Sequence, residues 1–169
     1  PYNKQISNRN FLSTTGFKFI LTEFPKADFF SNSAVIPSIN LGVAIQPTYL
    51  KDIPIPGDKL SFDDFILNFL VDEELENYIS LHKWLEGLGY PESLSQYRDL
   101  INEDPYNPGV HNADAGQSDG TLIVYNSNYN PILKVKFRGL FPVSLSTIEF
   151  DAKDQAVNYI TAQVTFKYT

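Results

Sequence analysis

Cysteine and methionine are both absent from this sequence of 169 residues, and tryptophan occurs only once. Without cysteine the chain can form no disulfide framework, no thiolate metal site and no cysteine nucleophile. The uninterrupted apolar runs are only a few residues long, whereas a helix that spans a bilayer needs about 20. We therefore expect no membrane anchor. No basic-then-apolar leader opens the sequence, so we also expect no export signal.

The composition is that of one folded domain. Hydrophobic residues make up 43% of the chain and charged residues 20%, which excludes disorder as the dominant state. The length predicts a single domain over residues 1–169. The net charge of −7 disfavours tight nucleic-acid binding, and thirteen of the 20 acidic residues fall within residues 61–120. A solvated helix face and a soluble loop would be enough to explain that concentration.

Alternating apolar residues predict several β-strands. We expect strands over residues 17–24, 60–71, 121–125, 133–137 and 160–168, with a turn over 126–131. Five prolines should break residues 25–58 into short extended pieces, with a turn at 57–58. We expect residues 139–142 to interrupt the strand that precedes them, and a shift in apolar phase between 143 and 150 predicts a bulge.

One amphipathic helix is expected after Asp72, which is a favourable N-cap. Its apolar stripe consists of Leu75, Tyr78, Ile79, Leu81, Leu85 and Leu88. Gly87, Gly89 and Pro91 should end it. Residues 90–120 show no sustained periodicity and predict a long loop. Together these elements predict a mainly β fold, a two-sheet antiparallel β-sandwich or barrel with one flanking α-helix.

Catalytic chemistry has little support in the sequence. His82 lies on the helical stripe and favours a packed or interface role, while His111, near Asp114 and Asp119, lacks the ligand spacing of zinc or EF-hand sites. Neighbouring carboxylates at Asp63 and Asp64 would point to opposite faces of a strand and could not work as a pair. No nucleophile elbow or phosphate-binding loop is present. We therefore predict no enzyme, no catalytic residue, no metal site and no cofactor.

Several short motifs, in order along nearly the whole chain, resemble the tail tube proteins of contractile-tailed bacteriophages. They are Ala34-Val35-Ile36-Pro37, then Phe62-Asp63-Asp64-Phe65, then Asp72-Glu73 with Trp84 twelve residues on, and finally Lys136-Phe137-Arg138-Gly139-Leu140-Phe141-Pro142. The second is similar to the family's Phe-Asp-Asp-Trp, with Phe65 in place of the tryptophan. The last is similar to its Lys-Gly-Leu-Trp-Pro turn. An apolar strand near the C-terminus completes the likeness.

The resemblance implies a structural protein of the virion with a two-sheet β fold. In that family six copies close into a ring around a channel, and stacked rings form the inner tube of the contractile tail, the conduit for DNA ejection. The implied partners are further copies in a homo-hexamer, the tail sheath, the baseplate and the tape measure protein. DNA would pass through the channel without specific binding, and assembly would take place in the host cytoplasm.

Specialised rings share the same fold, and the length of the 90–120 segment leaves them open. A baseplate-side tube initiator or adaptor and a tail terminator are the alternatives within the family. From another class, a monomeric β-sandwich that binds carbohydrate or peptide would use exposed aromatic residues. Those residues would be Tyr97, Tyr106, Tyr125 and Tyr129. An acid-dependent hydrolase is the remaining alternative.

A subunit interface is predicted in the proline-rich segment over residues 43–55, which is apolar and short of charge. In light of the resemblance, this segment would be a hairpin that reaches a neighbouring subunit or ring. As a solvent-exposed loop it would be a liability, whereas an interface would cover it; the alternative is that it packs on its own core. The expected interface residues are Val43, Ile45, Tyr49, Leu50, Ile53 and Ile55. The basic outer face of the strand at Lys134, Lys136 and Arg138 is either solvated or makes inter-ring charge contacts with the acidic middle third.

Overall fold

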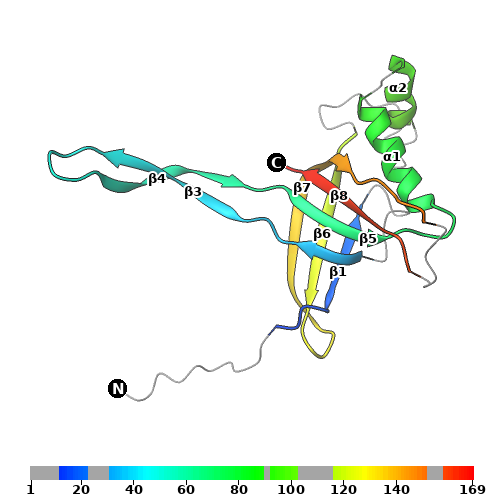
Figure 1. Cartoon of the computed structure of the whole chain (residues 1–169), viewed down its shortest axis with the longest axis horizontal. Coiled ribbons are helices and arrows are strands. Elements are labelled where there is room, and N and C mark those ends of the chain that lie inside the picture. Colours follow the sequence, from blue (N-terminus) through cyan, green and yellow to red (C-terminus); the bar gives the residue numbers. More distant parts are fainter. Residues whose placement is uncertain (1–11, 23–30, 90–91, 103–115, 152–157) are drawn as a thin grey trace.

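A computed structural model describes residues 12–22, 31–89, 92–102, 116–151 and 158–169. It has a β-rich body from which a long two-stranded arm projects (Figure 1). The body sheet has the strand order β1-β6-β7-β8-β5-β2, with every neighbouring pair antiparallel. Its strands are β1 (Phe17–Leu21), β2 (Ser31–Val35), β5 (Phe65–Leu70), β6 (Ser118–Tyr125), β7 (Pro131–Leu145) and β8 (Thr161–Lys167). The arm consists of β3 (Ile39–Gln46) and β4 (Ile53–Phe62), and the helices are α1 (Glu76–Gly89) and α2 (Leu94–Asn102). The predicted mainly β, antiparallel fold is confirmed, with two helices in the described ranges where one was expected.

Strand β7 links the two halves of the body sheet. Its first half pairs with β6 and its second half with β8. The change of partner falls between Leu140 and Phe141, next to Gly139, whose φ of 58° is in the left-handed region that glycine adopts without strain. The predicted interruption at 139–142 is wrong, because the strand continues through it to Leu145. A register shift lies between Pro142 and Ser144, at the edge of the 143–150 segment for which a bulge was expected, and the strand ends at Leu145.

The core forms where the two halves of the folded sheet face each other. Phe65 of β5 is fully buried, with ring centroids 5.0 Å from Phe19 of β1 and 4.6 Å from Phe137 of β7. On β5 and β8, the buried side chains alternate with partly exposed ones, as a strand covered on one face requires. Trp84 of α1 packs on the same cluster, 6.1 Å from Phe166 between ring centroids.

The arm replaces three features expected from the sequence. Residues 39–62 are not short extended pieces but two paired strands, and Pro54 and Pro56 lie inside β4 opposite Ile45 and Val43. Both strands of a two-stranded ribbon are edge strands, where proline is tolerated because its nitrogen can face away from the ladder. The expected turn at 57–58 is a register shift opposite Gly42 instead. The expected strand over 60–71 is divided at Asp63 and Asp64 into β4 and β5.

Helix α1 begins later than the sequence predicts. Leu75 has a φ of 59°, so the chain turns at Asp72 and becomes helical only at Glu76. The buried side of α1 consists of Asn77, Leu81, Trp84 and Gly87, rather than the full predicted stripe. Asn77 joins the helix to the sheet, because its amide nitrogen donates to the Leu70 carbonyl oxygen at 2.9 Å and its amide oxygen accepts from the Asp72 nitrogen at 3.2 Å. The predicted end at Gly89 is confirmed.

Helix α2 occupies part of the segment that was expected to be a long loop. Leu94, Tyr97 and Leu100 recur at helical spacing, a pattern too short to stand out from the sequence alone. Gly87 lets α2 approach α1 closely, because a Cβ there would lie 2.9 Å from the Cβ of Leu100. The predicted loop over 90–120 is thus wrong for residues 94–102 and for 118–120, which belong to β6. Residues 103–115 lie outside the described ranges.

Candidate assembly interface

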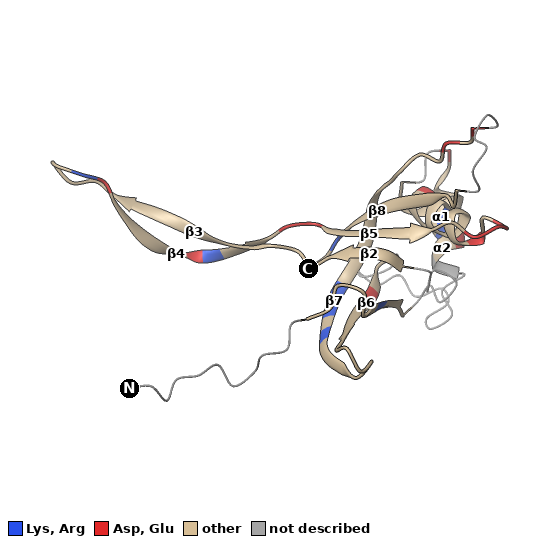
Figure 2. Ribbon diagram, turned by 60° about the horizontal axis from the view of Figure 1, so that its bottom comes forward, with Lys and Arg blue, Asp and Glu red and all other residues tan. Residues whose placement is uncertain are grey.

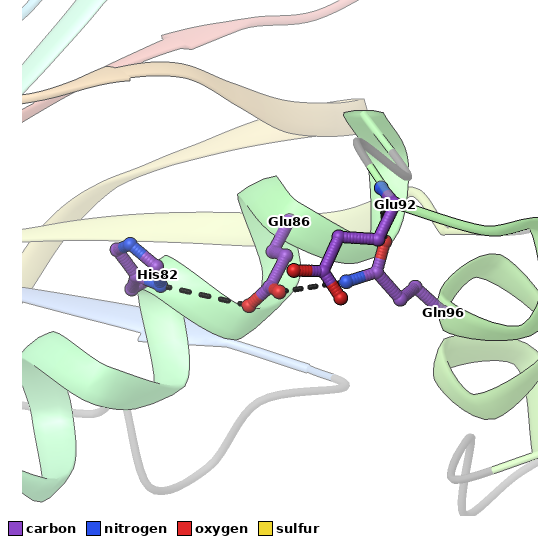
Figure 3. Close-up of polar contacts among 4 residues, drawn as sticks. All are labelled: His82, Glu86, Glu92 and Gln96. Atoms are coloured by element: carbon purple, nitrogen blue, oxygen red, sulfur yellow. Dashed lines mark hydrogen bonds and ion pairs between the residues drawn. The ribbon is translucent and has the colours of Figure 1, made fainter.

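The described histidine, His82, is not placed for catalysis. It lies exposed on α1, and its Nδ1 is 3.8 Å from Oε2 of Glu86, one turn further along (Figure 3). Oε1 of Glu86 accepts a hydrogen bond of 2.8 Å from Nε2 of Gln96 on α2. The cluster therefore links the two helices. The packed role expected for His82 is wrong because this position faces solvent, and the interface role stays a prediction.

The described residues contain no metal site, and Asp63 and Asp64 do not act as a pair. No group of three or more histidine, aspartate or glutamate side chains there could hold a metal ion. His111 and Asp114 lie outside the described ranges, while Oδ1 of Asp119 accepts a hydrogen bond of 3.3 Å from the Gly139 nitrogen. Asp63 accepts a hydrogen bond from Ser38, and Asp64 lies 3.9 Å from Nζ of Lys167, so the two carboxylates have different partners. No helix in the described part is both long and apolar enough to cross a membrane.

The arm presents apolar side chains to solvent along its whole length. The predicted interface residues Val43, Ile45, Tyr49, Leu50, Ile53 and Ile55 are all exposed. Tyr49 and Leu50, between the two strands, have relative exposures of 109% and 99%. The alternative in which this segment packs on its own core is therefore wrong, because the arm points away from the body (Figure 1).

The base of the arm has one apolar face that sequence reasoning missed. Ile39 pairs with Phe62 and Leu41 pairs with Leu60, so these four side chains share one face, and all are half or more exposed. The opposite face at the base is polar, with Asn40 opposite Ser61. The alternation of apolar residues over 39–45 indicates this face in the sequence. The nearby prolines argued against a strand there, so the face was not predicted.

Toward its tip the arm is apolar on both faces. Val43 and Ile45 lie with Pro56 and Pro54 on one face, while Ala44 pairs with Ile55 on the other. The arm's four charged residues are Lys51, Asp52, Asp58 and Lys59, two of each sign. Figure 2 shows them as a small group near the tip and another on β4, with uncharged ribbon between. An exposed apolar surface of this kind is typical of a protein interaction site.

Tyr168 anchors the arm to the body. Its hydroxyl donates to the backbone oxygen of Asp63 at 3.1 Å, and its ring lies between Phe137 of the core and Phe62 at the base of the arm. The Asp63 nitrogen donates to the Ser38 carbonyl oxygen at 3.2 Å, which ties the two strands of the arm together where they leave the body. Burial, and then the charges of Asp63 and Asp64, raise the pKa of Tyr168 above its ordinary value of 10.0.

Alkaline pH should therefore lower the stability of the folded wild-type protein through Tyr168. Above pH 10 the unfolded chain loses the phenol proton while the folded chain keeps it, so the folded state binds more protons and stability falls as pH rises. Tyr168→Phe removes the hydrogen bond and should lower the free energy of unfolding at pH 7 by about 0.5–1.5 kcal/mol. The difference in stability between wild type and variant should shrink above pH 10. Urea unfolding of both proteins across this pH range measures the effect. A difference that grows with pH would contradict the assignment.

Two strands of the body sheet have a neighbour on one side only within the described residues. These are β1 and β2, at the two ends of the strand order. An unpaired strand edge is a template for pairing with another chain unless it is covered. Within the described residues, β1 and β2 are therefore the two edge strands of the body sheet.

The basic strip is exposed, as predicted. Lys134 and Lys136 pair with Ile123 and Thr121 of β6, so both side chains lie on the outer face of the sheet, and Arg138 follows in the same alternation. Figure 2 shows the basic strip along β7, whereas acidic residues gather at the α1 end of the body. Of the aromatics proposed for a sugar site, Tyr129 is 79% exposed, Tyr97 and Tyr125 are partly buried on separate elements, and Tyr106 lies outside the described ranges.

Comparison with known proteins identifies relatives in contractile tails. No protein-family profile matches the chain. Over 144 residues it is 25% identical to the tail tube terminator protein of Enterobacteria phage T4, a match that spans 82% of this chain and 73% of that protein.

Solved structures of contractile systems have the same architecture. The tube-terminating cap of the anti-feeding prophage aligns with a TM-score of 0.63 at 16% identity, over 96% of this chain and 89% of that one. A chain of the anti-feeding prophage baseplate aligns with a TM-score of 0.61 at 10% identity, over 97% and 94%. A chain of the PVC extracellular contractile injection system's sheath/tube terminator aligns with a TM-score of 0.58 at 15% identity, over 95% of this chain and 94% of that one. The resemblance to the tail tube family is confirmed, and the chain has the tail-tube fold found in contractile phage tails and related injection systems.

Proposed function

We propose that this protein is a structural ring that ends the inner tube of a contractile tail, as a tail tube terminator does. The observation that carries this proposal is the match to the T4 tail tube terminator protein over 82% of the chain. Two of the similar structures are also terminators or caps. We place the protein in the virion or an equivalent particle. Six copies in the ring, contacts with sheath and baseplate, and a channel for DNA and tape measure protein follow from the family resemblance.

The exposed surfaces support an assembly role. The outermost strands among the described residues, β1 and β2, would let copies extend one sheet around a ring, which covers strand edges. The arm would then cover its apolar faces on a neighbouring copy or on the tube beneath. The predicted interface residues on the arm and the basic strip on β7 remain proposals for these contacts.

Assembly with the cognate tube subunit tests the terminator function. We expect the purified protein alone to form discrete rings and no filaments under negative-stain electron microscopy. When it is added in increasing amounts to growing tubes, it should shorten them, and a gold-labelled copy should appear at one end only. An unrelated β-sandwich protein is the control for crowding. Label along the whole tube would identify a main tube subunit instead.

The main tube subunit is the second candidate. A chain of the PVC sheath–tube complex aligns with a TM-score of 0.56 over 94% of this chain, so the fold alone is compatible with both roles. Filaments that grow from the purified protein without any other component would favour this candidate over the terminator. A strict monomer with a sugar affinity abolished by Tyr129→Ala would favour the binding-module alternative.

A further inference from the structure

An apolar groove lies between the start of α1 and the segment after β7. It has a volume of about 450 Å³ and is lined by Leu75, Tyr78, Ile79, Thr147, Ile148 and Phe150. The Tyr78 hydroxyl donates to the Ser146 carbonyl oxygen at 3.1 Å, which holds the two walls together. Ile79 and Phe150 are 46% and 75% exposed. Within the described residues, the groove is therefore open to solvent.

The two described segments that line this groove carry charge of one sign. The two segments that line it, residues 72–79 and 147–151, contain six carboxylates and no lysine or arginine. They are Asp72, Glu73, Glu74, Glu76, Glu149 and Asp151. Figure 2 shows acidic residues gathered at this end of the body, away from the arm. An occupant of the groove should therefore combine an apolar anchor with positive charge.

The turn between β6 and β7 has this chemistry. Tyr129 is 79% exposed at the turn, and Ile132 is 58% exposed at the start of β7. Lys134 and Lys136 follow on β7 with their side chains on the outer face of the sheet. Apolar anchors and basic side chains thus occur together on one short hairpin.

The same turn is held rigidly in one conformation. Oδ1 of Asn126 accepts hydrogen bonds of 2.9 Å from the backbone nitrogens of both Asn128 and Asn130. The Tyr129 nitrogen donates to the Asn126 carbonyl oxygen at 3.0 Å, and Tyr129 has a φ of 58°. A side chain other than glycine in the left-handed region is uncommon and persists only where surrounding bonds enforce it. The exposed ring is therefore presented at little further cost in conformational entropy on binding.

We propose that the Tyr129 turn of one copy docks in the acidic-rimmed groove of a second copy. This inference rests on the proposed ring, for which it names a contact between neighbours. The turn lies at the lower end of the sheet in Figure 1 and α1 begins at its right side, so the contact joins two different surfaces. Contacts of this heterologous kind generate closed rings when the rotation between copies closes.

Charge reversal on each side tests the contact in the purified full-length chain. Lys134→Glu with Lys136→Glu should weaken self-association at least tenfold, and so should Glu74→Lys with Glu149→Lys. The four substitutions in one chain restore opposite charges across the contact and should recover most of the association. Sedimentation velocity over a concentration series measures each variant, and circular dichroism checks that each one folds.

Substitution of the anchor tests the apolar part. Tyr129→Asn removes the ring but tolerates the left-handed backbone, so it should keep the fold and weaken association at least tenfold. Tyr129→Phe keeps the ring and should associate as the wild type does. If Glu74→Lys with Glu149→Lys weakens association while Lys134→Glu with Lys136→Glu leaves it unchanged, a second copy does not occupy the groove through its Tyr129 turn. That result would indicate a different basic partner.

Failure of this inference can be separated from failure of the proposed function. If the charge variants and Tyr129→Asn self-associate like the wild type, or if the wild type stays monomeric at every concentration, the contact is overturned. The tube-shortening and end-labelling experiment is read independently in each case. Tubes that are still capped would leave the terminator proposal in place without this contact.

Discussion

Replacement of Val43 or Ile53 by aspartate should abolish assembly and leave the folded chain intact. Both side chains are exposed on the arm, 66% and 47% respectively, so each change should alter the free energy of unfolding by no more than about 0.5 kcal/mol. In the assembled state each aspartate would bury an unpaired charge, at a cost of about 3 kcal/mol or more. That corresponds to roughly a hundredfold loss in the association constant.

The two positions also report on opposite faces of the arm. Val43 lies on the face of Ile45, whereas Ile53 pairs with Gln46 on the other face. Ser61→Asp on the polar face at the base adds the same charge and should leave assembly unchanged. Electron microscopy and sedimentation measure assembly, and the midpoint of urea unfolding measures folding. Loss of the folded monomer in the Val43 or Ile53 variant would contradict the interface assignment.

Phe65→Ala should have the largest effect on folding. Phe65 is fully buried between Phe19 and Phe137, and truncation of such a side chain typically costs about 3–5 kcal/mol. Because small domains are stable by only about 5–15 kcal/mol, a large part of the stability should be lost. The single tryptophan, Trp84, is buried in the same core and reports unfolding by fluorescence.

Phe62→Ala is the matched control for this substitution. It removes the same ring three residues earlier, but Phe62 is 54% exposed at the base of the arm and contacts Tyr168. We expect Phe62→Ala to lower the free energy of unfolding by about 1 kcal/mol or less and to impair assembly. A substitution in the core should instead affect mainly folding. Equal losses of stability in the two variants would contradict the division between core and arm.

The sequence predicted the elements whose periodicity is regular and local. The terminal strand β8, the turn after β6 and the end of α1 at Gly89 are confirmed because each depends on near neighbours. Residues 43–55 were expected as a hairpin in light of the family resemblance, and the pairing of β3 with β4 confirms it. Its full length was missed, since prolines disfavour strands in general and a two-stranded ribbon with open edges accommodates Pro54 and Pro56. The start of α1 was misplaced because the turn at Leu75 depends on Asn77, which holds the end of β5.

Some of the candidate surfaces could likewise be predicted from the local sequence, whereas others could not. Exposed apolar residues between 43 and 55 were expected from composition, and the structure places them on the arm. The apolar face at the base of the arm and the groove beside α1 depend on pairing between distant segments, such as Ile39 with Phe62 and α1 with residues 147–150. No local pattern reveals such surfaces, because each is formed by residues that only the fold brings together.

The two prolines of β4 have a consequence for the chain before it assembles. Proline has no amide hydrogen, so Pro54 and Pro56 leave β4 without two of the donors that a further strand would need. An apolar ribbon with a complete set of donors would invite fibrillar stacking of free copies. If the proposed ring forms, a free copy could therefore keep its exposed apolar arm in solution without adding a further strand to it, and contact with a neighbour would depend on the fit of side chains.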